Sequence, residues 1–160
     1  MGERFNELYQ LYKNDIYRLA YSYLLNEQDS EDVIQKVYIK LYNNKKILTL
    51  SNNEAKRWLF RICINESKDI LKSPWKKLKA TINNDIKDNK TKDDSLVDAL
   101  NNINPDFRIP LYLFYYEGYS IKEIASQLNK SESAIKMRLL RGKKVIENLV
   151  VPNIEDEYDK

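Results

Sequence analysis

Histidine is absent from this 160-residue sequence, and cysteine occurs once, as Cys63. The chain therefore has no His-based general acid or base, no Ser–His or Cys–His nucleophilic pair, no zinc finger and no intramolecular disulfide. Its three glycines, Gly2, Gly118 and Gly142, lie too far apart to form a phosphate-binding loop. These absences argue against an enzyme with a small-molecule substrate, and we expect neither a metal nor a cofactor.

Long apolar runs are missing as well. No run approaches the roughly 18 apolar residues that a membrane-spanning helix needs. The first ten residues, MGERFNELYQ, lack the apolar core of a signal peptide. We therefore expect no direct membrane insertion, and the single cysteine suits a reducing cytosol. The formal net charge is only +3, so any attraction to a polyanion must come from local patches.

What the sequence does have is helical periodicity. Only 3 glycines and 4 prolines accompany a hydrophobic content of 42%, which favours long helices around a core. Apolar residues at intervals of three and four predict helices over residues 3–25, 30–44 and 52–72, with a break at 26–29. Ser51 and Glu54 have the spacing of a capping box for the third helix, and Pro74 ends it. Residues 1–72 are therefore predicted to form one helical bundle.

Residues 73–92 are basic and have no clear period. A charged, aperiodic segment is typical of a flexible linker that water solvates. The alternative is a basic segment that also follows a nucleic-acid backbone.

A second helical module is predicted over residues 93–150, followed by a frayed acidic tail at 151–160. It begins with a short helix at 95–103, then a helix with Pro105 in its first turn and a kink at Pro110.

Two further helices follow in this module, joined by a turn of about three residues. Ser120 and Glu123 form another capping box, Asn129 can take the left-handed conformation that ends a helix, and Ser131 can cap the next one. This local chemistry predicts a helix-turn-helix, so the fold class is all-α with two bundles.

The second helix of this pair carries an unusual mixture on its outer face. Its inner stripe is Ile135, Leu139, Gly142, Ile146 and Leu149. The opposite face carries Ser133, Lys136, Met137, Leu140, Arg141 and Lys144. A DNA major groove presents phosphates, guanine acceptors and thymine methyl groups together, which suits both the cations and the apolar side chains. The alternative is an ordinary amphipathic helix whose apolar residues touch a neighbouring module.

This stretch resembles the DNA-binding region 4 of bacterial sigma factors. The family pattern is roughly y-x-E-I-A-x-x-L-x-x-S-x-x-T-V-K-x-R-L-x-R-A-K-K, and this chain has IKEIASQLNKSESAIKMRLLRGKK. Further, SEDVIQKVYIKLY resembles the region 2 signature A-E-D-x-x-Q-x-x-F-x-x-x-[WY]. KRWLFRICINESKDILK resembles W-L-x-R-I-A-x-N-x-x-x-D-x-x-R. The resemblance runs from Phe5 to Leu149 without equivalents of region 1.1 or region 3, which is typical of the extracytoplasmic-function (ECF) class.

The resemblance implies a dissociable sigma factor that binds the RNA polymerase core and recognises −10 and −35 promoter elements. The −35 contacts would come from Ser131, Ser133, Lys136, Met137, Arg138, Leu140, Arg141 and Lys144. The −10 contacts would come from Lys56, Arg57, Trp58, Arg61, Asn65 and Lys68, together with the loop at 43–55. The polymerase contacts would come from Asp32, Gln35 and Lys36.

The implied partners are promoter DNA, the β′ clamp helices and β flap of the polymerase, and an anti-sigma factor. That factor could hold the cytoplasmic protein at the membrane. The chain departs from the family at Lys36, where an acid is frequent, at Ile64, where a basic residue is frequent, and at Cys63 and Gly142, where alanine is frequent. An alternative function is a stand-alone helix-turn-helix regulator, whose first 72 residues would serve dimerisation or ligand binding.

Overall fold

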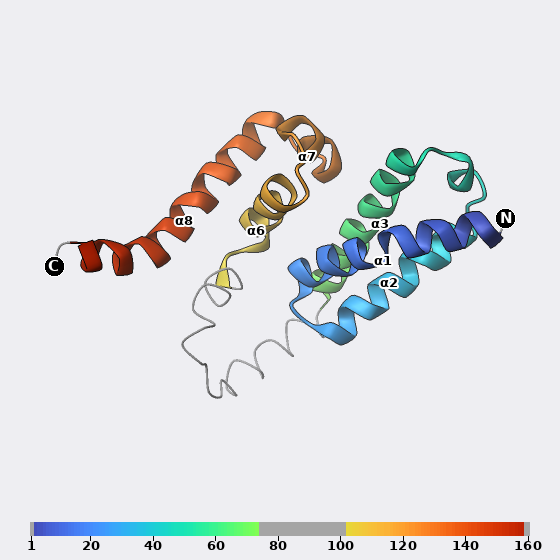
Figure 1. Cartoon of the computed structure of the whole chain (residues 1–160), viewed down its shortest axis with the longest axis horizontal. Coiled ribbons are helices and arrows are strands. Elements are labelled where there is room, and N and C mark those ends of the chain that lie inside the picture. Colours follow the sequence, from blue (N-terminus) through green and yellow to red (C-terminus); the bar gives the residue numbers. More distant parts are fainter. Residues whose placement is uncertain (1, 74–101, 159–160) are drawn as a thin grey trace. The chain divides into compact units, whose positions relative to one another are not determined.

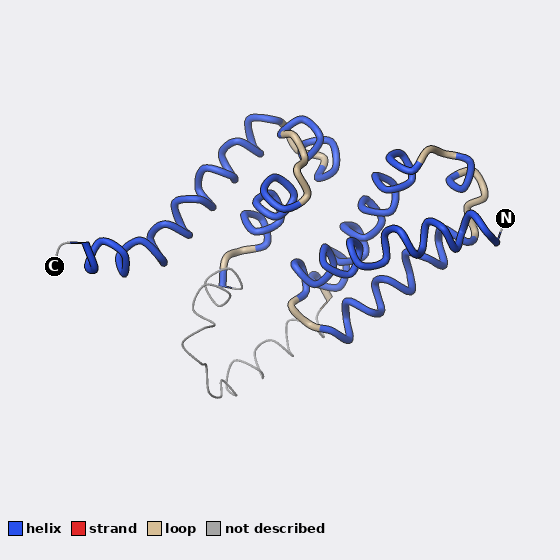
Figure 2. The backbone as a smooth tube through the Cα atoms, viewed as in Figure 1, coloured by secondary structure: helices blue, strands red, loops and turns tan. Residues whose placement is uncertain are grey.

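The computed structural model describes residues 2–73 and 102–158, with only the backbone described for 149–158. Every regular element in these ranges is a helix, as the composition predicts (Figures 1 and 2). The chain divides into two compact units, one within residues 1–86 and the other within 87–160.

The first unit is a bundle of three helices that pack pairwise against one another. Helix α1 spans Gly2–Leu24, α2 spans Glu27–Tyr42 and α3 spans Asn52–Lys72, with a short 3-10 helix η1 at Ile47–Thr49 (Figure 1). The helices meet along the apolar stripes that the sequence predicts. Residues with no exposed surface include Leu8, Ile16, Leu19, Ala20, Val33, Val37, Leu41, Leu59, Phe60 and Cys63.

The predicted start of the second helix was wrong by three residues. The break between α1 and α2 is only Leu25 and Asn26, and Leu25 adopts a positive φ of 52°. Asn26 is the N-cap, because its side-chain oxygen accepts a hydrogen bond from the Asp29 backbone N–H at 2.8 Å. Glu27 and Asp29 then place negative charge in the first turn, where the helix dipole favours it. Ser30, the predicted first residue of this helix, lies fully buried inside α2.

The third helix has the predicted bounds and cap. The Ser51 hydroxyl accepts a hydrogen bond from the Glu54 backbone N–H, and the Glu54 carboxylate accepts one from the Ser51 backbone N–H. Ser73 is the C-cap residue, directly before Pro74.

The second unit contains α6 (Pro105–Leu111), a π-helical turn η3 (Tyr112–Tyr116), α7 (Ile121–Leu128) and α8 (Glu132–Tyr158). Helix α8 packs against both α6 and α7. Pro105 lies in the first turn of α6, behind the N-cap Asn104, as predicted. Pro110 lies inside α6, where a kink is predicted, and the chain changes from α-helix to π-helix after Leu111. A proline removes a helical hydrogen bond, and π-helical turns occur mostly as single-turn irregularities in α-helices.

The predicted end of the last helix differs from the structure. The backbone of α8 continues to Tyr158, so the tail at 151–160 is helical through most of its length rather than frayed. The predicted linker at 73–92 and the predicted short helix at 95–103 lie almost entirely outside the described residues.

Candidate nucleic-acid interface

Three capping interactions set both ends of α7 and the start of α8. The Ser120 hydroxyl accepts a hydrogen bond from the Glu123 backbone N–H at 3.1 Å at the start of α7. Asn129 ends α7 in the left-handed conformation, with φ 55° and ψ 49°, and the Lys130 N–H bonds back to the Ala125 carbonyl at 2.9 Å. The Ser131 hydroxyl then accepts a bond from the Ala134 N–H at 3.1 Å. The predicted helix-turn-helix is therefore confirmed in its local geometry.

Tertiary packing fixes which face of α8 points outward. Ile135 has no exposed surface, Gly142 is buried, and Leu139 and Ile146 are half-buried, as the inner stripe predicts. At Gly142, helix α8 comes very close to helix α6. A Cβ atom there would lie 2.8 Å from Leu111 Cδ1 and 3.3 Å from Phe107 Cβ. The glycine thus allows α8 to approach α6.

The outer face of α8 is open and mixed in chemistry. Met137 and Leu140 are 47% and 53% exposed, although large apolar side chains are usually buried. Lys136, Arg141 and Lys144 are exposed beside them, and none forms an ion pair with a residue whose side chain is described. Ser131 and Ser133 are also exposed, whereas Arg138 is half-buried. The structure therefore brings the predicted −35 residues onto one continuous surface, with Arg138 at its margin.

The residues predicted on α3 divide into two groups. Arg57, Arg61 and Asn65 are exposed at successive turns of one helical face. Lys56, Trp58 and Lys68 are half-buried, so Trp58 is not a fully buried core residue. The Lys56 ammonium lies over the aromatic rings of Tyr12 and Phe60, 5.9 and 5.2 Å from their centroids. This contact turns Lys56 toward α1. Ile64, the position where the family frequently has a basic residue, is only 1% exposed.

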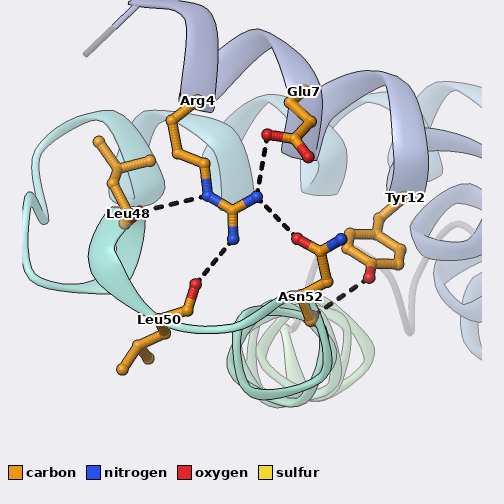
Figure 3. A network of polar contacts seen from close by, with 6 residues as sticks. All are labelled: Arg4, Glu7, Tyr12, Leu48, Leu50 and Asn52. Atoms are coloured by element: carbon orange, nitrogen blue, oxygen red, sulfur yellow. Dashed lines mark hydrogen bonds and ion pairs between the residues drawn. The ribbon is translucent and has the colours of Figure 1, made fainter.

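The loop before α3 is tied to the first turn of α1. The Arg4 guanidinium donates to the carbonyls of Leu48 and Leu50 and to the side-chain oxygen of Asn52, at 3.2, 2.7 and 2.7 Å (Figure 3). The same group pairs with Glu7 at 3.0 Å. Sequence reasoning missed this residue, since nothing near Arg4 in the sequence indicates a partner more than forty positions away.

The Tyr12 hydroxyl ties the same region to α1 a second time, because it donates to the Asn52 carbonyl at 3.1 Å (Figure 3). Ile47 anchors the loop from inside, with 8% of its surface exposed.

The outer face of α2 holds the three residues predicted to contact polymerase. Gln35 and Lys36 are exposed, and Asp32 is half-buried. Beside them, Ile39 and Tyr42 are 60% and 67% exposed, one and two turns after Gln35. A shallow groove of about 500 Å³ runs along this face, lined by Phe5, Gln35, Tyr38, Ile39, Tyr42 and Asn43. An apolar groove flanked by polar residues is more typical of a docking surface than of a purely solvated helix.

The buried titratable groups belong to the core rather than to a reactive site. Burial raises the pKa of the Cys63 thiol to about 12, and the thiol donates to the Ile16 carbonyl at 3.5 Å. A thiol that stays protonated is a poor nucleophile, which fits the interpretation of Cys63 as a small core residue. Burial also raises the pKa of the Tyr38 hydroxyl. Within the described residues, no group of three or more cysteine or acidic side chains is placed to bind a metal ion.

Two family models match this sequence in the expected order. The model for Sigma-70 region 2 matches residues 8–77, and the model for Sigma-70, region 4 matches residues 93–146. The chain belongs to the sigma-70 family of RNA polymerase sigma factors. The region 2 match contains α2 and α3, and the region 4 match contains the helix-turn-helix.

Relatives of this sigma factor place it in the ECF class. The RNA polymerase sigma factor SigV of Bacillus subtilis is 28% identical over 142 residues, which cover 84% of each chain. The ECF sigma factor SigX of the same organism is 29% identical over 167 residues, which cover 91% of this chain and 83% of SigX.

Solved structures agree with the fold. The sigma factor RpoE from Bartonella quintana, solved in complex with the anti-sigma factor NepR, has a TM-score of 0.69 at 19% identity, covering 91% of this chain and 96% of RpoE. CnrH, solved with the cytosolic domain of CnrY, has a TM-score of 0.67 at 20% identity, covering 95% of this chain and 90% of CnrH. In this sigma factor, no helix within residues 2–73 and 102–158 has the length and apolar content to span a bilayer.

Proposed function

We propose that this sigma factor directs the RNA polymerase core to promoters whose −35 element is read by α8 and whose −10 element is read by α3 and the loop at 43–51, which is the part of the predicted segment 43–55 that precedes α3. The observation that carries this proposal is the outer face of α8. Its exposed cations have no acidic partners among the described side chains, and exposed Met137 and Leu140 lie between them.

The chemistry of this face matches a major groove at three kinds of contact. Arg141 suits bidentate hydrogen bonding to guanine, and Lys136 and Lys144 suit phosphate oxygens. Met137 and Leu140 suit thymine methyl groups. The capped start of α8 at Ser131 also presents backbone N–H groups, which favour a phosphate.

The −10 element would meet the exposed face of α3. Arg57 and Arg61 would neutralise the backbone of the DNA, and Asn65 would hydrogen-bond to it or to a base edge. Half-buried Trp58 offers part of its ring to an unstacked base. Lys68 continues this face toward the end of α3, and Lys56 contributes charge from its position over two aromatic rings.

The groove on α2 would receive the polymerase, with Asp32, Gln35 and Lys36 as polar contacts and with the β′ clamp helices as the docking element. Exposed Ile39 and Tyr42 support this assignment, since apolar area at the centre of a polar face is typical of protein interfaces. The β flap would contact the second unit. An anti-sigma factor would cover one of these surfaces when transcription is not needed, as NepR accompanies RpoE in its solved complex.

Run-off transcription with purified core polymerase and a promoter series tests the proposal. Arg141→Ala should relax base preference at one or two −35 positions by roughly 1 to 3 kcal/mol of discrimination. Lys144→Ala should instead weaken binding to all −35 sequences about equally. It should also lower the slope of log affinity against log salt concentration by about one unit. Variants of the −10 element are the internal control, because neither substitution should change the preference there.

Two results would contradict the proposal. Arg141→Ala could leave every −35 variant equally active with an intact fold, in which case α8 is not the reading element. Alternatively, the chain could bind a palindromic duplex tightly by itself, with core polymerase adding nothing. That behaviour would make it a stand-alone helix-turn-helix regulator.

A further inference from the structure

The first turn of α1 controls the path of the loop that leads into α3. Arg4 uses all three guanidinium nitrogens, because Nε donates to Leu48, Nη2 to Leu50 and Nη1 to Asn52 (Figure 3). These acceptors follow one another at every second residue. One planar group therefore fixes the direction of the chain from η1 to the start of α3.

The geometry of these bonds requires arginine. The guanidinium is a rigid fork whose donors point in fixed, divergent directions, whereas a lysine ammonium is a single point. Two of the three acceptors are backbone carbonyls, that of Leu48 in the short η1 and that of Leu50 directly after it, and Arg4 donates a hydrogen bond to each. The Arg4 side chain is 24% exposed, which screens it partly from solvent, and Glu7 holds it from the side.

Apart from its bonds to Arg4, the loop at 43–51 is short and has local backbone hydrogen bonds. Its own hydrogen bonds join the N–H groups of Ile47, Thr49 and Leu50 to carbonyls three residues earlier, at 3.1 to 3.2 Å. The outer surface of the loop is formed by exposed Lys45, Lys46 and Thr49. A reading surface discriminates better between bases when its conformation is set before DNA binds, because less free energy is then spent on ordering it.

We propose that Arg4 is a positioning residue for −10 recognition, which holds the loop at 43–51 in the conformation that selects the −10 sequence without touching DNA itself. This inference rests on the proposed function, since it assigns the loop to the −10 element. It adds a determinant in the first turn of α1, outside the residues matched by the region 2 model.

Three variants isolate the contribution of the fork. Arg4→Gln removes the charge and the fork, and Arg4→Lys keeps the charge alone. Arg18→Gln is the matched control, because Arg18 is an exposed arginine on the same helix that pairs with Asp15.

Hydrogen exchange of the free sigma factor directly measures how firmly Arg4 holds the loop at 43–51. Arg4→Gln and Arg4→Lys should both speed exchange at Ile47, Thr49 and Leu50 by at least about tenfold, because several hydrogen bonds are lost together. Arg18→Gln should leave these rates unchanged. Unchanged rates in both Arg4 variants would overturn the proposal.

Run-off transcription then tests the consequence for promoter choice. With core polymerase and a library of single-base −10 variants, both Arg4 substitutions should lower the ratio between the best and worst base by about threefold to tenfold. Preference at the −35 element should stay as in the wild type. A uniform loss over all −10 variants, or full rescue by lysine, would overturn the positioning role, because either result indicates a general charge effect.

The result for the wild-type protein distinguishes a failure of the proposed function from a failure of the role of Arg4. If the wild type shows no −10 preference with core polymerase, the proposed function fails and the role of Arg4 fails with it. If the wild type selects its −10 sequence and Arg4→Gln selects equally well, only the role of Arg4 is wrong.

Discussion

Gly142 offers a prediction in which two known effects oppose each other. Replacing this glycine with alanine should favour the helical conformation by about 1 kcal/mol, because glycine is the weaker helix former. The structure adds an opposing effect, since the new Cβ would lie 2.8 Å from Leu111 Cδ1, 3.2 Å from Leu111 Cγ and 3.3 Å from Phe107 Cβ. Leu111 is only 6% exposed, so its side chain has little room to move away.

The steric effect should outweigh the helix propensity. Overfilling a packed core typically costs about 1 to 3 kcal/mol. We therefore expect Gly142→Ala to lower the free energy of unfolding of the second unit by about 1 kcal/mol. In a Leu111→Ala background the two nearest atoms are gone, and the same substitution should raise this free energy by up to about 1 kcal/mol.

Hydrogen exchange of backbone amides in α7 and α8 measures this free energy for the second unit alone, without a contribution from the first. The four proteins of the double-mutant cycle are compared under identical conditions, and the expected coupling is about 1 to 2 kcal/mol. If Gly142→Ala has the same effect with and without the Leu111 side chain, contact with α6 is not the reason for the glycine. A stabilising effect in the wild-type background would likewise contradict the steric argument.

Three further predictions concern the core. Tyr38→Phe should leave the free energy of unfolding unchanged or raise it by up to about 1 kcal/mol in urea denaturation, because the buried Tyr38 hydroxyl has no hydrogen-bond partner among the described residues. A loss above 1 kcal/mol would show that the hydroxyl is bonded. Cys63 should make stability fall with alkaline pH. Above about pH 9 the unfolded thiol loses its proton, whereas the folded thiol keeps it up to its pKa of about 12. The free energy of unfolding should thus fall by up to about 1.4 kcal/mol per pH unit more in the wild type than in Cys63→Ala, and parallel curves would refute this. Ile135→Ala should destabilise the second unit by about 2 to 5 kcal/mol in the same exchange experiment, since Ile135 is fully buried. Met137→Ala should cost less than about 0.5 kcal/mol there, and an equal cost would mean that the outer face of α8 is packed rather than open.

Much of the fold was predictable because its signals act over a few residues. The capping boxes at Ser51 and Ser120, the left-handed Asn129 and the first-turn Pro105 each satisfy backbone groups within one turn. The apolar period likewise defined the inner faces of α1, α3 and α8. The region 2 and region 4 motifs indicated the family from these same local stretches.

Errors occurred at two helix ends. The polar run from Asn26 to Asp29 predicted a break between two helices, but Asn26 caps α2 and the helix begins at Glu27. Leu25, directly after α1, adopts a positive φ, which is rare for an apolar residue. At the other end of the chain, an acidic and polar composition predicted fraying, but α8 continues to Tyr158.

Only the tertiary structure determined contacts between residues distant in sequence. Arg4 meets acceptors 44 to 48 positions away, and Gly142 meets Leu111 across the packing of α6 on α8. The sequence by itself determined most of the helix boundaries and the family, because those features depend on neighbours within a turn. Which arginine holds the loop and which glycine lets two helices touch depended on where the folded chain brings distant residues. A periodic pattern describes a face of one helix but does not say which side chain lies opposite it.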